Sequence, residues 1–184
     1  GVQTCALPIY VAAKGIGAGY LFIHGGGKIS STQRQKFVSL AGGHDANFVV
    51  IPTSLADQDI DIAAIKRKFQ INWKVNNVTV LHTRDRKVAN NPDFYEAISR
   101  ANGIWLHGGR QWRYVDAYLG TKVEDQIKAA IARGAIVGGS SAGASIQASF
   151  LVRGSPGAKE GANGNNRILI APGYTQGFGL LPAS

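Results

Sequence analysis

The sequence predicts an α/β fold in which helices cover both sides of a mostly parallel sheet. Three observations support this prediction: short continuous apolar runs recur along the chain, patterns with helical spacing separate them, and glycines cluster where the runs end. Continuous apolar runs are typical of strands that are buried on both faces, and a regular alternation of strand and helix favours parallel crossover connections. We therefore expect a three-layer αβα sandwich.

The strands and helices follow from these patterns in chain order. The strands are predicted at Tyr20–Ile23, Phe48–Ile51, Val78–Leu81, Ile104–Leu106 and Ala135–Val137. The helices are predicted from three apolar stripes at helical spacing: Ile62, Ile65 and Phe69; Phe94, Ala97, Ile98 and Ala101; and Val123, Ile127, Ala130 and Ile131. Asn91 and Pro92 form a favourable N-cap and first turn, and Gly134 is predicted to end the last helix. A long loop is expected over residues 153–166, with a further strand at Ile168–Ile170.

Composition limits the function classes. The chain has 184 residues, of which 45% are apolar, so we expect one globular domain. Its net charge of +9 is scattered and densest at Lys66–Lys68, which is typical of a solvated helix face. Since aromatic residues do not interleave these charges, we expect no nucleic-acid partner. No apolar run is long enough to span a membrane, so no membrane partner is expected. The single cysteine, Cys5, indicates no redox compartment.

The N-terminal segment, residues 1–18, is treated separately from the domain. Its opening stretch GVQTCALPI matches the in-frame translation of a common sequencing-adapter oligonucleotide. We interpret residues 1–9 as an artefact of sequence assembly and place a single domain over residues 19–184. An ordinary irregular N-terminus is the alternative.

The stretch GGSSAGAS, residues 138–145, stands where the last of the five strands passes into a helix. Residues 139–143 fit the pattern G-x-S-x-G, in which a serine on a strained and crowded turn needs small neighbours. Ser141 is the predicted nucleophile, whereas Ser140 misses the register of the motif. The N–H group of Ala142, at the start of the helix, is a predicted oxyanion donor. The alternative is a turn that binds a phosphate without catalysis.

The fourth predicted strand ends in the sequence HGGRQ, residues 107–111. Glycines at a strand end permit close approach of the backbone, so the Gly109 N–H is predicted to complete the oxyanion hole and Gln111 to bind a substrate amide. Arg110 and Arg113 are candidates for binding a carboxylate. The alternative is a plain turn that opens an amphipathic helix, with Arg113 facing the solvent.

The first predicted strand ends in HGGGK, residues 24–28, which invites two misleading interpretations. A phosphate-binding P-loop fails because Phe22 and Ile29 occupy positions that the motif gives to Gly and Ser or Thr. The lipase oxyanion motif matches at His24–Gly27, but too many elements separate it from the elbow. Because the carboxyl ends of parallel strands share one edge, we expect Gly26, Gly109, Gln111 and Ser141 to surround one cleft.

The four histidines, namely His24, His44, His82 and His107, show no metal-ligand spacing, so no metal is expected. His24 and His107 follow strands on the edge that carries Ser141. Both interpretations of these two residues remain open: they line a pocket, or they are structural histidines with satisfied hydrogen bonds.

With GGRQ at residues 108–111 and GGSSAGASIQASFLVRG at residues 138–154, the chain resembles the cyanophycinase-like serine peptidases, which are relatives of the aspartyl dipeptidases. The resemblance runs from about residue 19 to residue 184. It implies the flavodoxin-like sandwich shared with class I glutamine amidotransferases, with Ser141 as the nucleophile and Gln111 as the active-site glutamine. An amidotransferase would need a cysteine where Ser141 stands.

Two departures from the family pattern change what the resemblance implies. Arg110 replaces the usual acid of the second loop, which puts the substrate preference of the polymer-degrading members in doubt for this chain. The histidine base of the family lies in an Asp-Gln-His segment shortly after a stretch similar to GFGLL, which here is GFGLLPAS at residues 177–184. We therefore expect the base beyond residue 184, a domain that is incomplete at its C-terminus, and no activity from these 184 residues alone.

The function predicted from the sequence is that of a serine-type peptidase without a cofactor. The resemblance implies peptide or isopeptide substrates, with aspartyl peptides and cyanophycin, a β-linked Asp-Arg polymer, as candidates. The predicted partner is a peptide substrate, and a homodimer is left open. Two alternatives from other classes are a non-catalytic module that binds an anion or small molecule on the same fold, and an α/β-hydrolase-type esterase.

Overall fold

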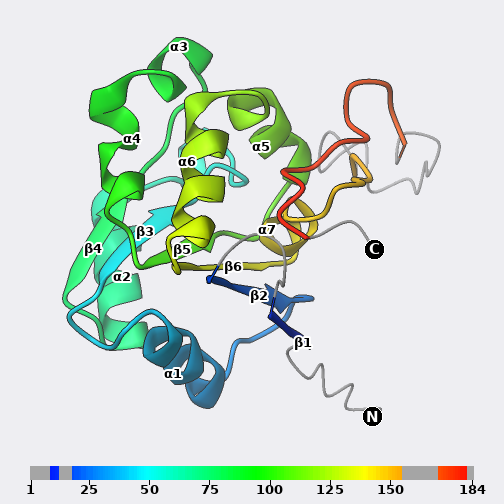
Figure 1. Ribbon diagram of the computed structural model, residues 1–184. Coiled ribbons are helices and arrows are strands. Elements are labelled where there is room, and N and C mark those ends of the chain that lie inside the picture. The colour runs from blue at the N-terminus through cyan, green and yellow to red at the C-terminus, as the bar shows by residue number, and fades with distance from the viewer. Residues whose placement is uncertain (1–8, 13–17, 155–169, 182–184) are drawn as a thin grey trace.

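The computed structural model describes residues 9–12, 18–154 and 170–181, and these contain one mixed sheet (Figure 1). The sheet has the strand order β1-β2-β6-β5-β3-β4. Its strands are β1 (Ile9–Ala12), β2 (Tyr20–His24), β3 (Asn47–Ile51), β4 (Asn77–Val80), β5 (Gly103–Leu106) and β6 (Ile136–Ser140). Strand β1 is antiparallel to β2, and all other neighbours are parallel. The mostly parallel sheet predicted from the apolar runs is therefore confirmed.

Helices follow the strands as the sequence predicts. They are α1 (Ser31–Leu40), α2 (Ile62–Trp73), α3 (Arg86–Ala89), α4 (Pro92–Ser99), α5 (Gln111–Tyr118), α6 (Lys122–Ala132) and α7 (Ala142–Ser145), with a 3₁₀ turn, η1, at Asp57–Asp59. The Asn91 side chain caps α4 by accepting from the Asp93 N–H, and Gly134 follows α6 with φ +107, as expected. Helix α1 lacks a strong apolar stripe. The sequence feature that marks the start of α1 is instead the capping box formed by Ser30 and Gln33.

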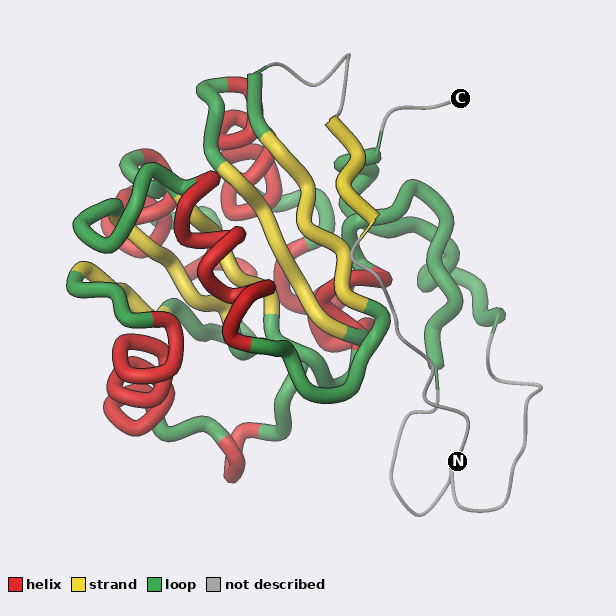
Figure 2. Tube along the Cα trace, turned by 90° about the horizontal axis from the view of Figure 1, so that it is seen from below, coloured by secondary structure: helices red, strands yellow, loops and turns green. Residues whose placement is uncertain are grey.

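The helices lie on both faces of the sheet because the chain reverses direction across it. From β2 the chain passes to β3 and β4, and it then returns through β5 to β6. Since crossover connections are right-handed, α1 and α2 cover one face and α4, α5 and α6 cover the other (Figures 1 and 2). The reversal leaves β3 and β5 side by side, and sheets of this class bind ligands at such a switch point.

The two faces of the sheet have different cores. On the face covered by α1 and α2, the core is aromatic and contains Phe22, Phe37, Phe48, Phe69, Trp73 and Trp105. The ring centroids of Trp73 and Trp105 are 4.7 Å apart, and those of Phe69 and Trp73 are 4.6 Å apart. The opposite face is mainly aliphatic, with Ile98, Ile104, Val123 and Ile127 among its fully buried residues. Both cores reach the carboxyl end of β5, through Leu106 on one face and Trp105 on the other.

Residues 170–181 return to the end of α7. The N–H of Phe178 donates to the Ile146 carbonyl at 2.7 Å, and the N–H of Leu180 donates to the Gln147 carbonyl at 2.8 Å. Both side chains are fully buried. The GFGLL stretch named in the resemblance therefore packs against residues 146–149, at the end of α7.

Parts of the sequence interpretation concern residues outside the described ranges. Residues 1–8, with Cys5, most of the predicted loop over residues 153–166, and residues 168 and 169 of the predicted strand all lie outside them. Ile170 lies in no strand. Strand β1 was not predicted: Ile9–Ala12 pair with residues 20–23, which places part of the N-terminal segment in the sheet.

Candidate active site

Ser141 lies on a strained elbow between β6 and α7. Its backbone angles are φ 52 and ψ −114, and among the described residues only Lys74 shares a positive φ with it outside glycine. Such a conformation costs about 1–3 kcal/mol in a non-glycine residue. Ser140 ends the strand, and the Ser141 residue is exposed. The elbow geometry predicted for Ser141, and not for Ser140, is confirmed.

The two glycines of the G-x-S-x-G motif are required by close packing. A Cβ atom at Gly139 would overlap the Gly143 carbonyl, and a Cβ atom at Gly143 would overlap the Leu106 carbonyl. The first turn of α7 therefore lies directly against the ends of β5 and β6. The Gln147 side chain, which is fully buried, donates to the Gly143 carbonyl at 2.9 Å and ties the end of the helical segment to the same turn.

His24, at the end of β2, holds the other side of the elbow. Its carbonyl accepts the Ser141 N–H at 2.9 Å, and its Nδ1 atom lies 3.2 Å from the Ser140 hydroxyl. The side chain is buried, and burial lowers the pKa of the imidazole below 6.5. Of the two interpretations left open for His24, the structural one is therefore correct. Gly26 follows on the loop with φ +137, and open space lies beside its α-carbon.

The Gly108–Gly109 pair is brought beside the elbow, as the sequence predicts. A Cβ atom at Gly108 would lie 3.4 Å from the Ser141 Cβ. Gly109 has φ +154, and a Cβ atom there would lie 2.5 Å from the Ser54 carbonyl oxygen, so only glycine fits this position. The Arg110 N–H donates to the same carbonyl at 2.9 Å.

Gln111, at the start of α5, bonds the segment that follows the elbow. Its Nε2 atom donates to the Val152 carbonyl at 2.7 Å, which ties α5 to residues 151–154. Of the four residues expected around one cleft, Gly109 lies on the loop beside Ser141 and Gly26 follows β2 at the same edge of the sheet. The binding of a substrate amide by Gln111 stays a prediction.

Ser54, which follows β3, fixes the Gly108–Gly109 loop and was not singled out from the sequence. Its Oγ lies within donor distance of the carbonyls of His107, at 2.8 Å, and Gly108, at 3.0 Å. Its own carbonyl accepts from the Arg110 N–H and from Arg113 Nη1, both at 2.9 Å. Ser54 is fully buried. The sequence signal was the polar pair after a buried strand, in PTS at residues 52–54.

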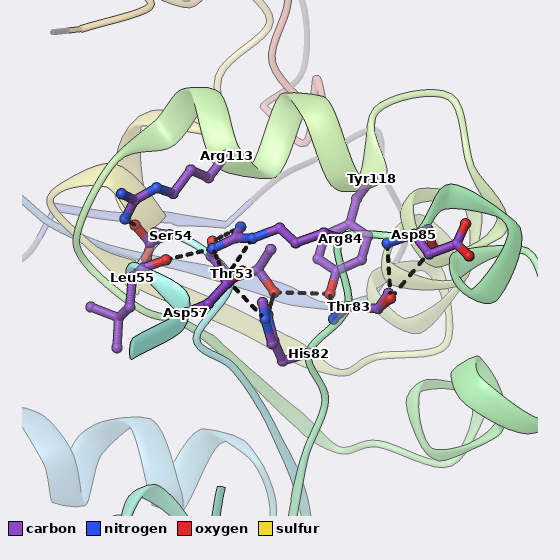
Figure 3. A network of polar contacts seen from close by, with 10 residues as sticks. All are labelled: Thr53, Ser54, Leu55, Asp57, His82, Thr83, Arg84, Asp85, Arg113 and Tyr118. Atoms are coloured by element: carbon purple, nitrogen blue, oxygen red, sulfur yellow. Dashed lines mark hydrogen bonds and ion pairs between the residues drawn. The ribbon is translucent and has the colours of Figure 1, made fainter. Parts of the chain in front are cut away.

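Arg84, after β4, holds the segment that contains Ser54 (Figure 3). Its guanidinium donates to the carbonyls of Thr53, at 2.5 Å, and Leu55, at 2.6 Å, and it pairs with Asp57 at 2.8 Å. The hydrogen bond from Arg84 lowers the pKa of the Asp57 carboxyl. Arg84 was missed because β4 ends without the glycine cluster that marks the other strand ends.

Tyr118, on α5, completes this network from the opposite side (Figure 3). Its hydroxyl lies 2.8 Å from Thr53 Oγ1 and accepts the Thr83 N–H at 3.2 Å. Thr53 Oγ1 also lies 3.1 Å from His82 Nδ1. Burial raises the pKa of Tyr118, so the hydroxyl stays protonated. We call Thr53, Ser54, Arg84 and Tyr118 the Ser54 network.

A hollow of about 300 Å³ lies beside α5 and is lined by charges of both signs. Arg84 and Arg113 line it with Asp57 and Asp116. The Arg113 guanidinium lies 5.3 Å from the centre of the Trp112 ring, which also lines the hollow. Burial and the neighbouring guanidinium groups of Arg84 and Arg110 lower the pKa of Arg113. Of the two arginines proposed to bind a carboxylate, Arg113 faces this hollow.

No group of three or more His, Cys, Asp or Glu side chains in residues 9–12, 18–154 and 170–181 is arranged to hold a metal ion. In the same ranges, no helix has the length and apolar character needed to cross a membrane.

Comparisons with known proteins point to one family. The sequence model of Peptidase family S51 matches residues 21–183. A cyanophycinase from Geminocystis herdmanii (strain PCC 6308) is 27% identical over 151 residues, which are 80% of this chain and 52% of that protein. A cyanophycinase from Synechococcus elongatus is 31% identical over 150 residues, which are 79% of this chain and 44% of that protein. The chain thus spans about half the length of the curated relatives that it matches.

Solved structures agree on the fold. A peptidase from an acI-B1 actinobacterium superposes with a TM-score of 0.66 at 20% identity, covering 89% of this chain and 65% of that one. A putative peptidase E protein from Listeria monocytogenes EGD-e superposes with a TM-score of 0.59 at 17% identity, and the superposition covers 88% of this chain and 74% of that one. At these identities the likeness concerns the fold alone.

Proposed function

The chain belongs to peptidase family S51, and on this premise we propose that it is a serine-type peptidase with Ser141 as its nucleophile. The observation that carries the proposal is the elbow itself. Ser141 is exposed and held at φ 52 and ψ −114 between β6 and α7. A serine on such a turn presents its hydroxyl above the edge of the sheet, where a substrate carbonyl can reach it.

The reaction proceeds through an acyl-enzyme. Ser141 Oγ attacks the scissile carbonyl carbon, its proton passes to a base, and the carbonyl oxygen becomes an oxyanion. The N–H of Ala142 is one donor, because the first residue of a helix has no acceptor within the helix. The N–H of Gly109, held beside the elbow by Ser54, is the second. The amine then leaves with a proton from the base, and water hydrolyses the ester to release the acid and restore Ser141.

The base is proposed to lie outside the described residues. The Ser141 hydroxyl makes no hydrogen bond to any histidine in residues 18–154 or 170–181, and His24 bonds the hydroxyl of Ser140. The resemblance to the cyanophycinase-like peptidases implies a histidine base that follows the GFGLL stretch. A general base contributes about 10²–10⁴-fold to the rate. We therefore expect the 184-residue chain to hydrolyse peptides at least about 100-fold more slowly than a protein extended by its native downstream sequence.

Aspartyl peptides and β-linked Asp-Arg are the proposed substrates. The names of the two cyanophycinase relatives support this choice. The hollow beside α5 also suits a substrate with charges of both signs. Arg113 would bind its carboxylate and Asp116 its guanidinium, because Arg84 and Asp57 already pair with each other.

Labelling with a fluorophosphonate probe, followed by mass spectrometry of the modified peptide, tests the nucleophile. We expect covalent labelling at Ser141, complete loss in Ser141→Ala, and no change in Ser149→Ala, which removes another exposed serine of the same segment. The probe is applied to the 184-residue chain and, separately, to the extended protein. No labelling of Ser141 in the extended protein would contradict the proposal and favour a non-catalytic module.

Hydrolysis assays on the extended protein test the substrate class. Release of free arginine from β-Asp-Arg, and much less from α-linked Ala-Arg, is the expected result. Equal rates on both dipeptides would contradict the substrate proposal while leaving the assignment of Ser141 intact.

A further inference from the structure

A second cavity lies behind the elbow, on the face of the sheet that α1 and α2 cover. Its volume is about 490 Å³, within the range of sites for small molecules. It is lined by residues of α2 on one side and by Trp105, His107, Gly108 and Ser140 on the other. Those four residues belong to the carboxyl ends of β5 and β6, so the cavity adjoins the two segments that hold Ser141.

The inner part of this cavity is aromatic. Phe69 and Trp73 from α2 and Trp105 from β5 line it, and each is at most 5% exposed. The rings of Phe69 and Trp73 are stacked, with 13° between their planes, and Trp73 lies against Trp105. Aromatic rings of a ligand pack well against such surfaces by offset or edge-to-face contact.

Two uncharged polar groups are available in the cavity wall. The backbone carbonyl of His107 accepts hydrogen bonds from Ser54 and Tyr114. The His107 imidazole makes no hydrogen bond to any described residue. Burial lowers the pKa of this imidazole to about 4, so at pH 7 it is neutral and has one donor and one acceptor nitrogen. The Ser140 hydroxyl bonds His24 Nδ1, and a hydroxyl has capacity for a further bond.

The charges at this cavity balance. Asp59 and Lys68 line it, both residues are exposed, and they have opposite signs. The charges of the hollow beside α5 also balance, but two arginines and two aspartates line it, so it is the more strongly charged of the two sites. A charged ligand would gain no net attraction from the cavity behind the elbow and would lose hydration on entering it.

We propose that the cavity behind the elbow binds an uncharged aromatic group that carries a hydrogen-bonding substituent. Its ring would pack against Trp73 and Trp105, and its substituent would bond the His107 imidazole and the Ser140 hydroxyl. The group has two sources with the same chemistry: a free small molecule, or an aromatic side chain of a peptide seated at Ser141. Only the second source rests on the proposed peptidase function.

Titration with benzamide, followed by tryptophan fluorescence, tests the cavity. Two of the three tryptophans, Trp73 and Trp105, line it, whereas Trp112 lies in the hollow beside α5. We expect saturable quenching with a Kd of about 1 mM, a usual affinity for a ligand of this size. Quenching that rises linearly with benzamide and never saturates would overturn the proposal.

Matched variants on α2 connect the binding to the cavity. Asn72 lines the cavity and is exposed, so Asn72→Phe should fill the mouth and raise the Kd at least about tenfold. Ile71→Phe adds the same ring at the neighbouring position, which is 68% exposed and outside the lining, and should leave the Kd within about twofold. His107→Leu, which removes the polar ring, should also weaken binding about tenfold. An unchanged Kd in Asn72→Phe would overturn the proposal, and circular dichroism checks that each variant is folded.

N-acetylphenylalaninamide distinguishes the two sources. If it competes with benzamide and slows fluorophosphonate labelling of Ser141, the cavity receives a peptide side chain. If benzamide binds without any change in labelling, the cavity is a separate small-molecule site. Failure of Ser141 to label in the absence of ligand would contradict the peptidase proposal. The fluorescence titration would still show whether the cavity binds benzamide.

Discussion

The elbow after β6 and the Ser54 network, which holds the loop after β5, keep two adjoining strand ends in place by different means. At the elbow, small residues allow backbone segments to touch, and a Cβ atom at Gly139 or Gly143 would overlap a carbonyl. At the Ser54 network, the Ser54 hydroxyl bonds the carbonyls of His107 and Gly108, and Arg84 and Tyr118 bond Thr53 beside it (Figure 3). The two regions together fix both proposed oxyanion donors.

The difference shows what each kind of support tolerates. Close packing fails when a single methyl group is added, because dense backbone contacts cannot move apart cheaply. A buried polar network fails when a partner is removed, because a carbonyl is then left without its hydrogen bond. Adding a methyl group at the elbow and removing a hydroxyl at the network therefore probe the same site from opposite directions.

Gly143→Ala should have the largest effect. The new Cβ atom would meet the Leu106 carbonyl, and we expect a loss of about 3 kcal/mol in the free energy of unfolding. In a chain of this size the melting temperature should fall by about 6–12 °C. Gly25→Ala is the matched control, because nothing lies within 4 Å of its Cβ position, and it should change stability by less than about 0.5 kcal/mol. Equal melting temperatures in the two variants would show that the elbow is not closely packed.

Lowering the pH should have the next largest effect on stability, and it acts through His107, whose carbonyl Ser54 bonds. Burial lowers the pKa of His107 to about 4 from 6.5, so between these values the unfolded chain binds more protons than the folded one. The free energy of unfolding should therefore fall by about 2–3 kcal/mol as the pH drops from 6.5 to 4. Above about pH 7.5 the imidazole is neutral in both states, so this contribution is constant.

Urea unfolding between pH 4 and pH 8 measures that pH dependence. His107→Gln should flatten the curve, and a smaller slope should persist because burial also lowers the pKa of His24 and His82. An identical slope in the variant and the parent chain would contradict the assignment to His107.

Ser54→Ala should cost about 2 kcal/mol, because it removes the donor to the buried carbonyls of His107 and Gly108. Tyr114 also bonds the His107 carbonyl and limits the loss. Ser39→Ala, at an exposed position of α1, is the control and should stay within about 0.5 kcal/mol of the parent. Denaturant unfolding gives both values, and equal stabilities would show that Ser54 does not support the loop.

Ser141→Gly should have the smallest effect, and it has the opposite sign. Glycine adopts φ 52 and ψ −114 with little strain, so this variant should be about 1 kcal/mol more stable than Ser141→Ala, which keeps the strain. Differential scanning calorimetry on the two variants measures the difference. A Ser141→Ala variant as stable as Ser141→Gly would mean that the elbow stores no strain.

The sequence predicts the elbow well because the features that define it are local. Gly139, Ser141 and Gly143 stand next to one another in the chain, and their small size is what the turn requires. The same is true of Gly109, whose φ of +154 only glycine adopts easily. The five parallel strands were predicted for a related reason, since continuous apolar runs directly report burial on both faces. Strand β1 has the sequence IYVA, which is also a continuous apolar run, and it was missed because residues 1–18 were set apart from the domain.

By itself, the sequence determined the α/β layers, the positions of five strands and the strained serine, because each depends on residues that are neighbours in the chain. Only the tertiary structure decided which side chains support the site. Ser54, Arg84 and Tyr118 are far apart in the sequence, and they meet because the strands that precede them, β3, β4 and β5, are neighbours in the sheet. The same holds for Gln111, which bonds Val152, and for His107, which faces the aromatic cavity. A hydrogen bond between distant residues depends on the packing of whole elements, and no local pattern of residues encodes that packing.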